Sequence, residues 1–529
     1  MARTLEQSQA DRPELGAPGD TRKWWVLAAM VFGLLMPMLD NLVVNVALPT
    51  IQRELGAGVS SLAWIIDAYT LTFASFMLTG GALGDLYGRK RFFMAGLVVF
   101  TMGSLLCGLS SSTPQLIAFR ATQGLGAALL LPGSLSIITA TFHGRERGAA
   151  IGIWAAFSGL AIALGPVVGG LLVEHVSWQS IFFINIPVGI TGLILTWIVV
   201  PETKDESRSR KVDPPGLVTG TAGIFFLVYA LIEGNAKGWT DATILGAFVL
   251  SAVLLVTFFQ VESRRASPML PLAFWRIPTF TAANIVAGSV FFALFGVTFF
   301  LTLYLQNVEG YSPVAAGFRL FPFTLMILIL APLSGRLSDK FGSRWFMTVG
   351  TFTAACGMAM LTRTDVGSSY TTVILPAFIL LGGGLATTMA PMTSAVMGSV
   401  DRRHAGIASA ATNTTRELGG VFGIAILGAV VTSSARRGVL SHLIANGIPS
   451  AQAAGLAGAA SGGAGAGVAP TSAGPIALAV KQSFVHAIHV GMLVGVCALL
   501  LASVVSALFV RSHVAAAGDG DGEQAYAAH

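Results

Sequence analysis

Apolar runs of about 20 residues alternate with short polar or charged segments along the whole chain. A helix of that length crosses the roughly 30 Å hydrocarbon core of a bilayer. The pattern therefore predicts an all-α polytopic membrane protein with about fourteen spanning helices. The runs begin near Trp25, Leu62, Phe92, Pro114, Gly148, Ser180, Leu217, Ala242, Thr279, Pro313, Arg344, Tyr370, Ala405 and Phe484.

The composition excludes a water-soluble globule. Of 529 residues, 54% are hydrophobic and only 11% are charged, with a mean hydropathy of +0.75, so the bilayer must be the main solvent. The net charge of +6 does not point to nucleic acid, because 22 of the 31 basic residues fall on one side of the predicted spans and six on the other. The positive-inside rule then places both termini in the cytoplasm. The remaining three, Arg120, Arg319 and Arg416, lie within spans.

A ten-residue motif occurs twice. Gly81 to Lys90 reads GALGDLYGRK, and Gly335 to Arg344 reads GRLSDKFGSR at a constant offset of 254 residues. Both copies follow an even-numbered span on the cytoplasmic side, which predicts two parallel repeats related by an axis along the membrane normal. The core is then two six-helix bundles with two additional central helices.

This repeat defines the expected domain organisation. The boundaries, all from the sequence, are a cytoplasmic N-terminal tail (1–23), an N-terminal six-helix bundle (24–200), a cytoplasmic linker (201–213), two extra helices (214–262), a second cytoplasmic linker (263–278), a C-terminal six-helix bundle (279–511) with an external Gly/Ala-rich loop (437–482), and a cytoplasmic C-terminal tail (512–529). We expect the substrate path to avoid the two extra helices.

Several further motifs occur in a fixed order. They are Leu39 to Pro49, Trp64 to Leu71, Arg120 to Ala127, Gly159 to Gly170, Trp178 to Gly189 and Asn413 to Gly420. Together with the repeated loop, they resemble the fourteen-helix drug/proton antiporter branch of the major facilitator superfamily, the EmrB/QacA-like multidrug efflux transporters. The resemblance extends over nearly every predicted span.

The resemblance implies a proton-coupled antiporter that exports drugs or other small, often lipophilic or cationic, organic molecules across the cytoplasmic (inner) membrane by alternating access. Export of one endogenous metabolite, import, sodium coupling and a non-transporting membrane sensor on the same fold stay open. No HExxH, GxSxG or Walker motif is present, so we expect neither an enzyme nor an ATP-driven pump. We expect no cofactor, no metal site and no disulfide, and a proton gradient as the energy source.

Three charged residues are predicted at one depth in the bilayer. At 1.5 Å per residue, Asp40 lies about 22 Å from the cytoplasmic start of the first span, and Asp67 and Arg120 lie about 8 to 9 Å from the external starts of theirs. Intramembrane charges are costly, so we expect all three to share a polar cavity. A structural role for Asp40 as the partner of Asn41, Asn45 or Arg120, and a merely hydrated Asp67, are the alternatives.

Glu417 is the fourth candidate coupling or substrate residue. It lies about 18 Å along its span, near the midplane. The side chain of the adjacent Arg416 points about 100° away from it, and a structural ion pair between the two is the alternative.

Two further sets of residues are assigned by the resemblance. The repeated loop is expected to form a cytoplasmic gate, in which Asp85 lies at a neighbouring helix N-terminus while Arg89 and Lys90 pair across the seam between halves; a role in topology alone is the alternative for the basic residues. The antiporter motif is expected to give close helix contact and a proline bend. The gate residues are Gly81, Asp85, Gly88, Arg89, Lys90 and Asp339; the antiporter motif residues are Gly159, Gly165, Pro166, Gly169 and Gly170.

The expected partners are a small-molecule substrate, protons and the lipid bilayer, with no nucleic acid. We expect a monomer, and an accessory periplasmic partner stays open.

Overall fold

The structure is a computed structural model. It describes residues 21–56, 59–142, 144–203, 214–265, 272–401, 404–445, 448–450, 452–453, 457 and 475–511. The predicted tails, parts of both linkers and most of the external loop lie outside these residues. Throughout the described part the chain is helical, and no strand occurs there.

The helices begin close to where the hydropathy pattern places them. The first half contains α2 (Arg22–Leu55), α3 (Val59–Tyr87), α4 (Arg89–Gly108), α5 (Thr113–Thr141), α6 (Gly144–His175), α7 (Ser180–Phe183) and α8 (Asn185–Val199). The two extra helices are α9 (Pro214–Lys237) and α10 (Ala242–Arg264).

The second half contains η1 (Leu272–Arg276), α11 (Pro278–Leu303), η2 (Tyr304–Val308), α12 (Pro313–Phe341), α13 (Ser343–Leu361), η3 (Tyr370–Ile374), α14 (Leu375–Gly398), α15 (Ala405–Ala445) and α17 (Pro475–Phe509). Eleven segments of the described chain are long and apolar enough to cross a membrane. The helices α3, α6 and α13 have comparable lengths and run among them. The total of fourteen spans stays a prediction.

Turn chemistry explains several of these boundaries. Gly88 and Gly342 occupy equivalent positions in the two repeated loops, and both have positive φ, 123° and 84°. A side chain is strained in that region, so glycine lets the chain reverse between two helices within one residue. Asp241 and Ser312 cap α10 and α12 by accepting hydrogen bonds from Thr243 N and Ala315 N, which satisfies backbone donors at the helix starts.

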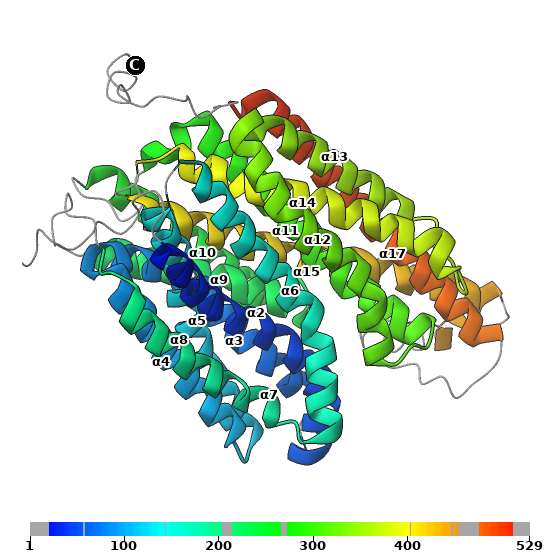
Figure 1. The fold of residues 1–529 in the computed structure, drawn as a ribbon. Coiled ribbons are helices and arrows are strands. Elements are labelled where there is room, and N and C mark those ends of the chain that lie inside the picture. The colour runs from blue at the N-terminus through cyan, green and yellow to red at the C-terminus, as the bar shows by residue number, and fades with distance from the viewer. Residues whose placement is uncertain are drawn as a thin grey trace, which may run out of the picture.

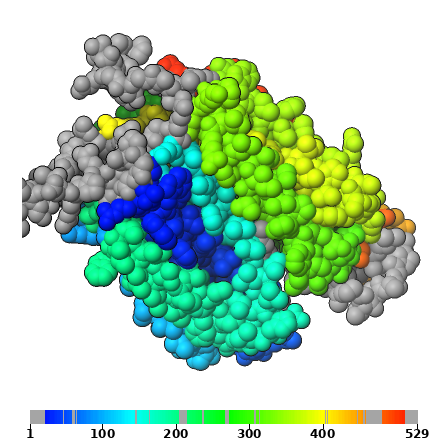
Figure 2. Space-filling model, in the orientation of Figure 1, coloured from blue at the N-terminus to red at the C-terminus, as the bar shows by residue number. Residues whose placement is uncertain are grey.

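The helices form two bundles that meet along two seams. In Figure 1 the helices α2 to α8, from blue to teal, lie on one side, and α11 to α17, from green to red, lie on the other. One seam joins α6 to α12, and the other joins α3 and α5 to α15. Figure 2 shows the first seam on the surface of the molecule, with α2 as a blue band, cyan α6 beside it and bright green α12 beyond α6.

The extra helices cover the second seam. Helix α9 contacts α3 from the first bundle and α15 from the second, and α10 packs against α9. An apolar cluster holds this junction together and includes Leu71, Val228, Leu231 and Val421. The pair α9–α10 is therefore not a detached spacer, since α9 touches both bundles.

The span expected to start at Ser180 runs from Ser180 to Val199, and only Ile184 separates α7 from α8, with its backbone still in the right-handed helical region. One sequence-based boundary needs correction. The external loop expected over 437–482 is shorter, because α15 continues to Ala445 and α17 begins at Pro475. Apolar residues of the two extensions, among them Val439, Leu443 and Val480, pack together and keep both segments helical.

Candidate functional site

A buried ion pair joins α2 to α5. The carboxylate of Asp40 accepts a hydrogen bond from Nη1 of Arg120, and neither side chain is exposed. Both residues were expected at one depth, and the structure brings them into direct contact. Because two opposite charges in a dry interior stabilise each other only when their remaining hydrogen bonds are made, the neighbours of this pair matter as much as the pair.

Amide side chains complete the coordination of Asp40. Gln123 Nε2 donates to Asp40 Oδ1 at 2.8 Å, and Asn185 Nδ2 donates to the same oxygen at 3.1 Å. Ser104 Oγ accepts from both amides, at 3.2 and 3.0 Å. Asn185 is the first residue of α8 and lies buried inside the bundle. We did not assign Gln123 or Asn185 from sequence, although both are polar residues within apolar motifs.

Arg120 is held from three further sides. Its Nε donates to the carbonyl of Ile65 at 3.0 Å, its Nη1 also donates to Gln123 Oε1 at 2.8 Å, and its guanidinium carbon lies 4.3 Å from the ring centre of Tyr69. One nitrogen, Nη2, is buried without a hydrogen-bond partner among the described residues. The guanidinium is thus fixed in place by α2, α3 and α5 together.

Asp67 lies apart from this network. Tyr69, two residues further along α3, faces Arg120, and two residues correspond to about 200° around a helix. The Asp67 side chain therefore leaves α3 on the opposite face, toward α9, and interacts electrostatically with Glu233 of that helix. The expectation that all three charges meet in one cavity holds for Asp40 and Arg120 and not for Asp67.

Glu417 and Arg416 are both buried in α15 but do not form an ion pair within the described structure. Arg416 donates from Nη1 to Asn413 Oδ1 at 3.1 Å and from Nη2 to Thr393 Oγ1. Its guanidinium stands 5.3 Å from the ring centre of Phe291 and 5.8 Å from that of Trp154, which belongs to the first bundle. Arg416 is held by neutral groups and aromatic rings, with its Nε buried and without a hydrogen-bond partner among the described residues. Glu417, 8% exposed, keeps its carboxylate apart from these contacts.

The glycines of α6 allow close contact with two neighbouring helices, α2 and α12. Cβ atoms at Gly165 and Gly169 would lie 2.6 and 3.0 Å from side-chain atoms of Leu42 and Val43 on α2. At Gly159 and Gly170 the corresponding neighbours are Ile327 and Val314 of α12, at 2.6 and 2.9 Å. Helix α6 thus uses small residues to approach its own bundle on one face and the other bundle on the next. Pro166 lies within α6, and its side chain is outside the described residues.

Asp85 crosses the cytoplasmic seam. Its Oδ1 accepts from Arg89 Nε at 2.7 Å, and its Oδ2 accepts from the backbone N of Ile407 at 2.9 Å, in the first turn of α15. A carboxylate at that position compensates the free N–H groups and the positive end of the helix dipole. Asp85 and Arg89 are 1% and 5% exposed, so the loop closes a dry contact between the bundles.

The other residues of the first loop stay within their own bundle. Lys90 donates from Nζ to the carbonyl of Trp197 at 2.7 Å rather than across the seam, because the end of α8 lies nearer than the second bundle. Glu202 accepts from the backbone N of Lys90 at 3.1 Å and fills the space beside Gly88, where a Cβ would lie 2.7 Å from its carboxylate. Gly81 is buried within α3.

Asp339 makes the reciprocal crossing from the second bundle. Its carboxylate lies against the backbone of Gly148 in the first turns of α6, and any Cβ at position 148 would collide with it. Arg147 interacts with the same carboxylate. Each repeated loop therefore places its aspartate at the N-terminal end of a helix in the opposite bundle.

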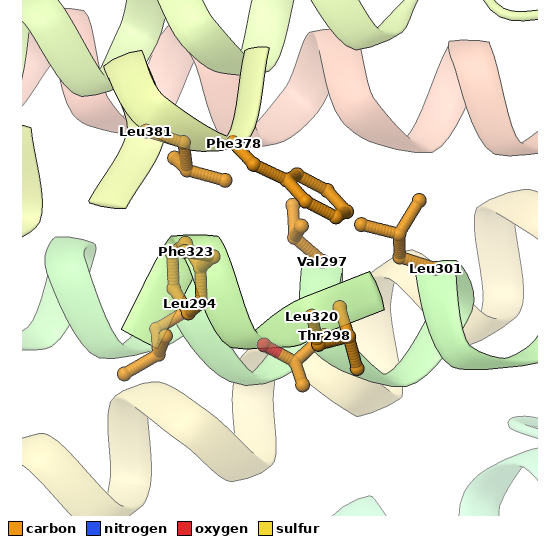
Figure 3. Close-up of a pocket in the computed structure, with 8 residues that line it drawn as sticks. All are labelled: Leu294, Val297, Thr298, Leu301, Leu320, Phe323, Phe378 and Leu381. Carbon is orange, nitrogen blue, oxygen red and sulfur yellow. The ribbon is translucent and has the colours of Figure 1, made fainter. Parts of the chain in front are cut away.

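A small apolar pocket lies inside the second bundle, away from these charges. Figure 3 shows its lining from α11, α12 and α14: Leu294, Val297, Thr298, Leu301, Leu320, Phe323, Phe378 and Leu381. Thr298 supplies the one polar side chain of the lining. The pocket offers apolar packing space and no charge that could couple to a proton.

The sequence profile of the Major Facilitator Superfamily matches residues 30–424. The tetracenomycin C resistance and export protein of Streptomyces glaucescens is 36% identical over 428 residues, 80% of this chain and 78% of that protein. The methylenomycin A resistance protein of Bacillus subtilis is 37% identical over 414 residues, 78% and 88% of the two chains. The puromycin resistance protein of Streptomyces alboniger is 36% identical over 427 residues, 80% and 84%.

A solved structure shows the same fold at low identity. The human organic anion transporter MFSD10 superposes with a TM-score of 0.59 at 14% identity, covering 90% of this chain and 99% of that one. The order of the helices, the repeated loops and the profile match all indicate the same family. The chain belongs to the Major Facilitator Superfamily.

Proposed function

We propose that this protein exports drugs or other small, often lipophilic or cationic, organic molecules across the cytoplasmic membrane in exchange for protons. The observation that carries the proposal is the buried Asp40–Arg120 pair, a carboxylate that can take up a proton inside a span. The similarity to proteins named for antibiotic resistance and export supports the direction and the substrate class.

The coupling step is the neutralisation of Asp40. A protonated carboxyl group no longer balances the charge of Arg120, so the ion pair loses its electrostatic stabilisation and Arg120 must find another partner. Ile65 and Tyr69 on α3 already contact Arg120. Protonation of Asp40 therefore weakens the attachment of Arg120 to α2, while its contacts with α3 remain.

A short path links this event to the seam between the bundles. Leu42 and Val43 follow Asp40 on α2 and lie against Gly165 and Gly169 of α6. The neighbouring face of α6, with Gly159, contacts α12. A shift of α2 then moves α6 against the second bundle, which is the motion that alternating access requires.

The aspartates of the two loops act as cytoplasmic latches. In the structure both loops are engaged, Asp85 with α15 and Asp339 with α6. Loss of these contacts frees the cytoplasmic ends of the bundles to separate, so engagement corresponds to a state closed toward the cytoplasm. Asp67 and Glu417 supply carboxylates for the cationic group of a substrate, and the antiporter motif supplies the moving interface.

A narrower substrate range is the second candidate. The relatives named above carry the names of single antibiotics, tetracenomycin C, methylenomycin A and puromycin. An exporter of one endogenous metabolite would use the same Asp40–Arg120 pair and latches. The two candidates differ in the breadth of compounds exported and not in the coupling.

The setting of the proposal is a monomer in the cytoplasmic membrane with both termini in the cytoplasm, working on a proton gradient without a cofactor. The test uses a pump-deficient bacterium preloaded with ethidium. Efflux on energisation that a protonophore stops, and that persists in sodium-free buffer, supports proton antiport. Efflux that needs sodium would contradict proton coupling, and absence of efflux for ethidium and for a panel of neutral and anionic antibiotics would contradict export.

A further inference from the structure

The accessory helix α9 runs antiparallel to α3 and touches it at two levels. Near the cytoplasmic side, Thr79 Oγ1 and Thr221 Oγ1 share a hydrogen bond of 2.7 Å. Near the external side, the rings of Trp64 and Tyr229 lie 6.2 Å apart between centres. The two helices therefore stay together across most of the bilayer.

This register brings two carboxylates to one depth. Asp67 lies twelve residues from Thr79 toward the external side of α3, and Glu233 lies twelve residues from Thr221 toward the external side of α9. Both distances correspond to about 18 Å along the helix axis. The charges of Asp67 and Glu233 interact in the structure.

Glu233 is held in an ion pair at this level. It is 9% exposed and forms an ion pair of 3.0 Å with Lys237 Nζ, one turn further along α9. Lys237 also donates to Tyr229 Oη at 2.9 Å, and its side chain is 41% exposed. The hydrogen bonds to Tyr229 and Glu233 raise the pKa of the Lys237 ammonium above its usual range, so this partner stays charged.

The other ionisable groups around Asp67 are already engaged or lie on other faces. Arg120 of α5 is paired with Asp40 of α2, on the far side of α3. Helix α15 contributes Glu417, α4 contributes the thiol of Cys107, which donates to Gln123, and α9 contributes Tyr229 with the Glu233–Lys237 pair. Within the described structure, Glu233 is thus the carboxylate on the α9 side of Asp67.

We propose that Glu233, itself restrained by Lys237, is a positioning residue that sets how tightly Asp67 holds its proton. The inference rests on the proposed role of Asp67 in substrate or proton coupling. It makes α9 part of the coupling machinery, contrary to the expectation that the extra helices lie outside it. Glu233 acts through Asp67 and need not touch the substrate.

Substitutions of Glu233 and Lys237 are expected to have opposite effects on proton binding by Asp67. A negative Glu233 makes the ionised form of Asp67 less favourable, so Glu233→Gln weakens proton binding by Asp67. Lys237 offsets part of the Glu233 charge, so Lys237→Met strengthens proton binding at the carboxylate pair. At partly buried separations such charges shift a titration by about half to one pH unit.

The experiment measures ethidium transport in proteoliposomes as a function of pH, with purified full-length protein. Glu233→Gln moves the pH of half-maximal transport to lower pH, Lys237→Met moves it to higher pH, and the double variant follows Glu233→Gln. Glu233→Asp keeps the charge and keeps the wild-type profile. Glu174→Gln, at an exposed glutamate on α6, is the matched control and leaves the profile unchanged.

The outcomes separate the inference from the function on which it rests. Superimposable profiles for wild type, Glu233→Gln and Lys237→Met overturn the inference, as do shifts of equal sign. If Glu233→Gln fails to insert into the membrane, Lys237→Met at the exposed position decides alone. A shift of the pH of half-maximal transport to higher pH supports the inference, and no shift overturns it. Asp67→Asn tests the parent proposal, because normal ethidium transport by that variant removes Asp67 from coupling whatever the α9 variants do.

Discussion

Arg120 donates one hydrogen bond to Asp40 and a second, of 3.0 Å, to the backbone carbonyl of Ile65, so one guanidinium connects α2 with α3. The first contact depends on the charge of Asp40 and the second does not. A proton on Asp40 therefore changes the balance between the two helices without breaking the bundle. This asymmetry is what the first prediction tests.

Asp40→Asn abolishes energised ethidium efflux and also lowers thermal stability. The amide cannot take up a proton, and it leaves Arg120 buried without its counter-charge, which costs about 3–5 kcal/mol. Efflux in cells and the melting temperature of the detergent-purified protein measure the two effects. The double variant Asp40→Asn/Arg120→Gln regains stability but not efflux. Efflux at the wild-type rate in well-expressed Asp40→Asn would remove this pair from coupling.

Gly165→Val impairs transport by forcing α6 away from α2. Its Cβ would lie 2.6 Å from Cβ of Leu42, and overpacking of this kind costs about 1–3 kcal/mol. Gly246→Val on α10 is the control, because a Cβ there has nothing within 4 Å. Leu42→Gly in the Gly165→Val background restores transport, because it removes the Cβ that the new side chain would meet. If Gly165 and Gly246 variants transport equally well, the close approach of α6 and α2 is not required.

The helix starts were predictable because they are set locally. A change from polar to apolar residues marks where a chain enters the bilayer, and the starts of the first thirteen predicted spans lie within four residues of the observed ones. The start of α17 at Pro475 depends on packing against the end of α15, which hydropathy does not report.

Depth in the membrane was predictable for the site, and rotation about the helix axis was not. The rise per residue placed Asp40, Asp67 and Arg120 at one level. Which way each side chain points depends on how each helix is rotated about its axis relative to its neighbours, and the Asp67 side chain points toward α9. Glu233 was missed because α9 was treated as peripheral; an intramembrane glutamate four residues before a lysine was the available signal.

Asp85→Asn opens the cytoplasmic seam more than Asp339→Asn does. The substitution weakens a charge-assisted hydrogen bond to Ile407 N, worth about 1.5–3 kcal/mol, and also removes the ion pair with Arg89. Spin labels at Tyr87→Cys and Trp345→Cys, exposed positions at the cytoplasmic ends of α3 and α13, report the separation of the bundles.

The labelled protein needs Cys356→Ala and Cys497→Ala as background, because both thiols are exposed while Cys107 is buried. In Asp85→Asn, we expect a population of molecules with a longer distance between the labels. That population is smaller in Asp339→Asn, and it is absent in the exposed control Glu174→Gln. Unchanged distances in both aspartate variants would contradict the latch.

Glu417→Gln separates a structural from a transporting role for the acidic residue of α15. Arg416 is held by Thr393, Asn413 and two aromatic rings, so removal of the Glu417 charge leaves these contacts intact and removes a buried carboxylate that forms no ion pair within the described structure. We expect an unchanged or higher melting temperature together with weaker efflux of ethidium than of a neutral antibiotic, because the lost group binds cations. Arg416→Gln, by contrast, lowers the melting temperature through its lost hydrogen bonds and ring contacts. A large drop in melting temperature for Glu417→Gln, matched by that of Arg416→Gln, would instead make the two residues a structural pair, since each would then depend on the other.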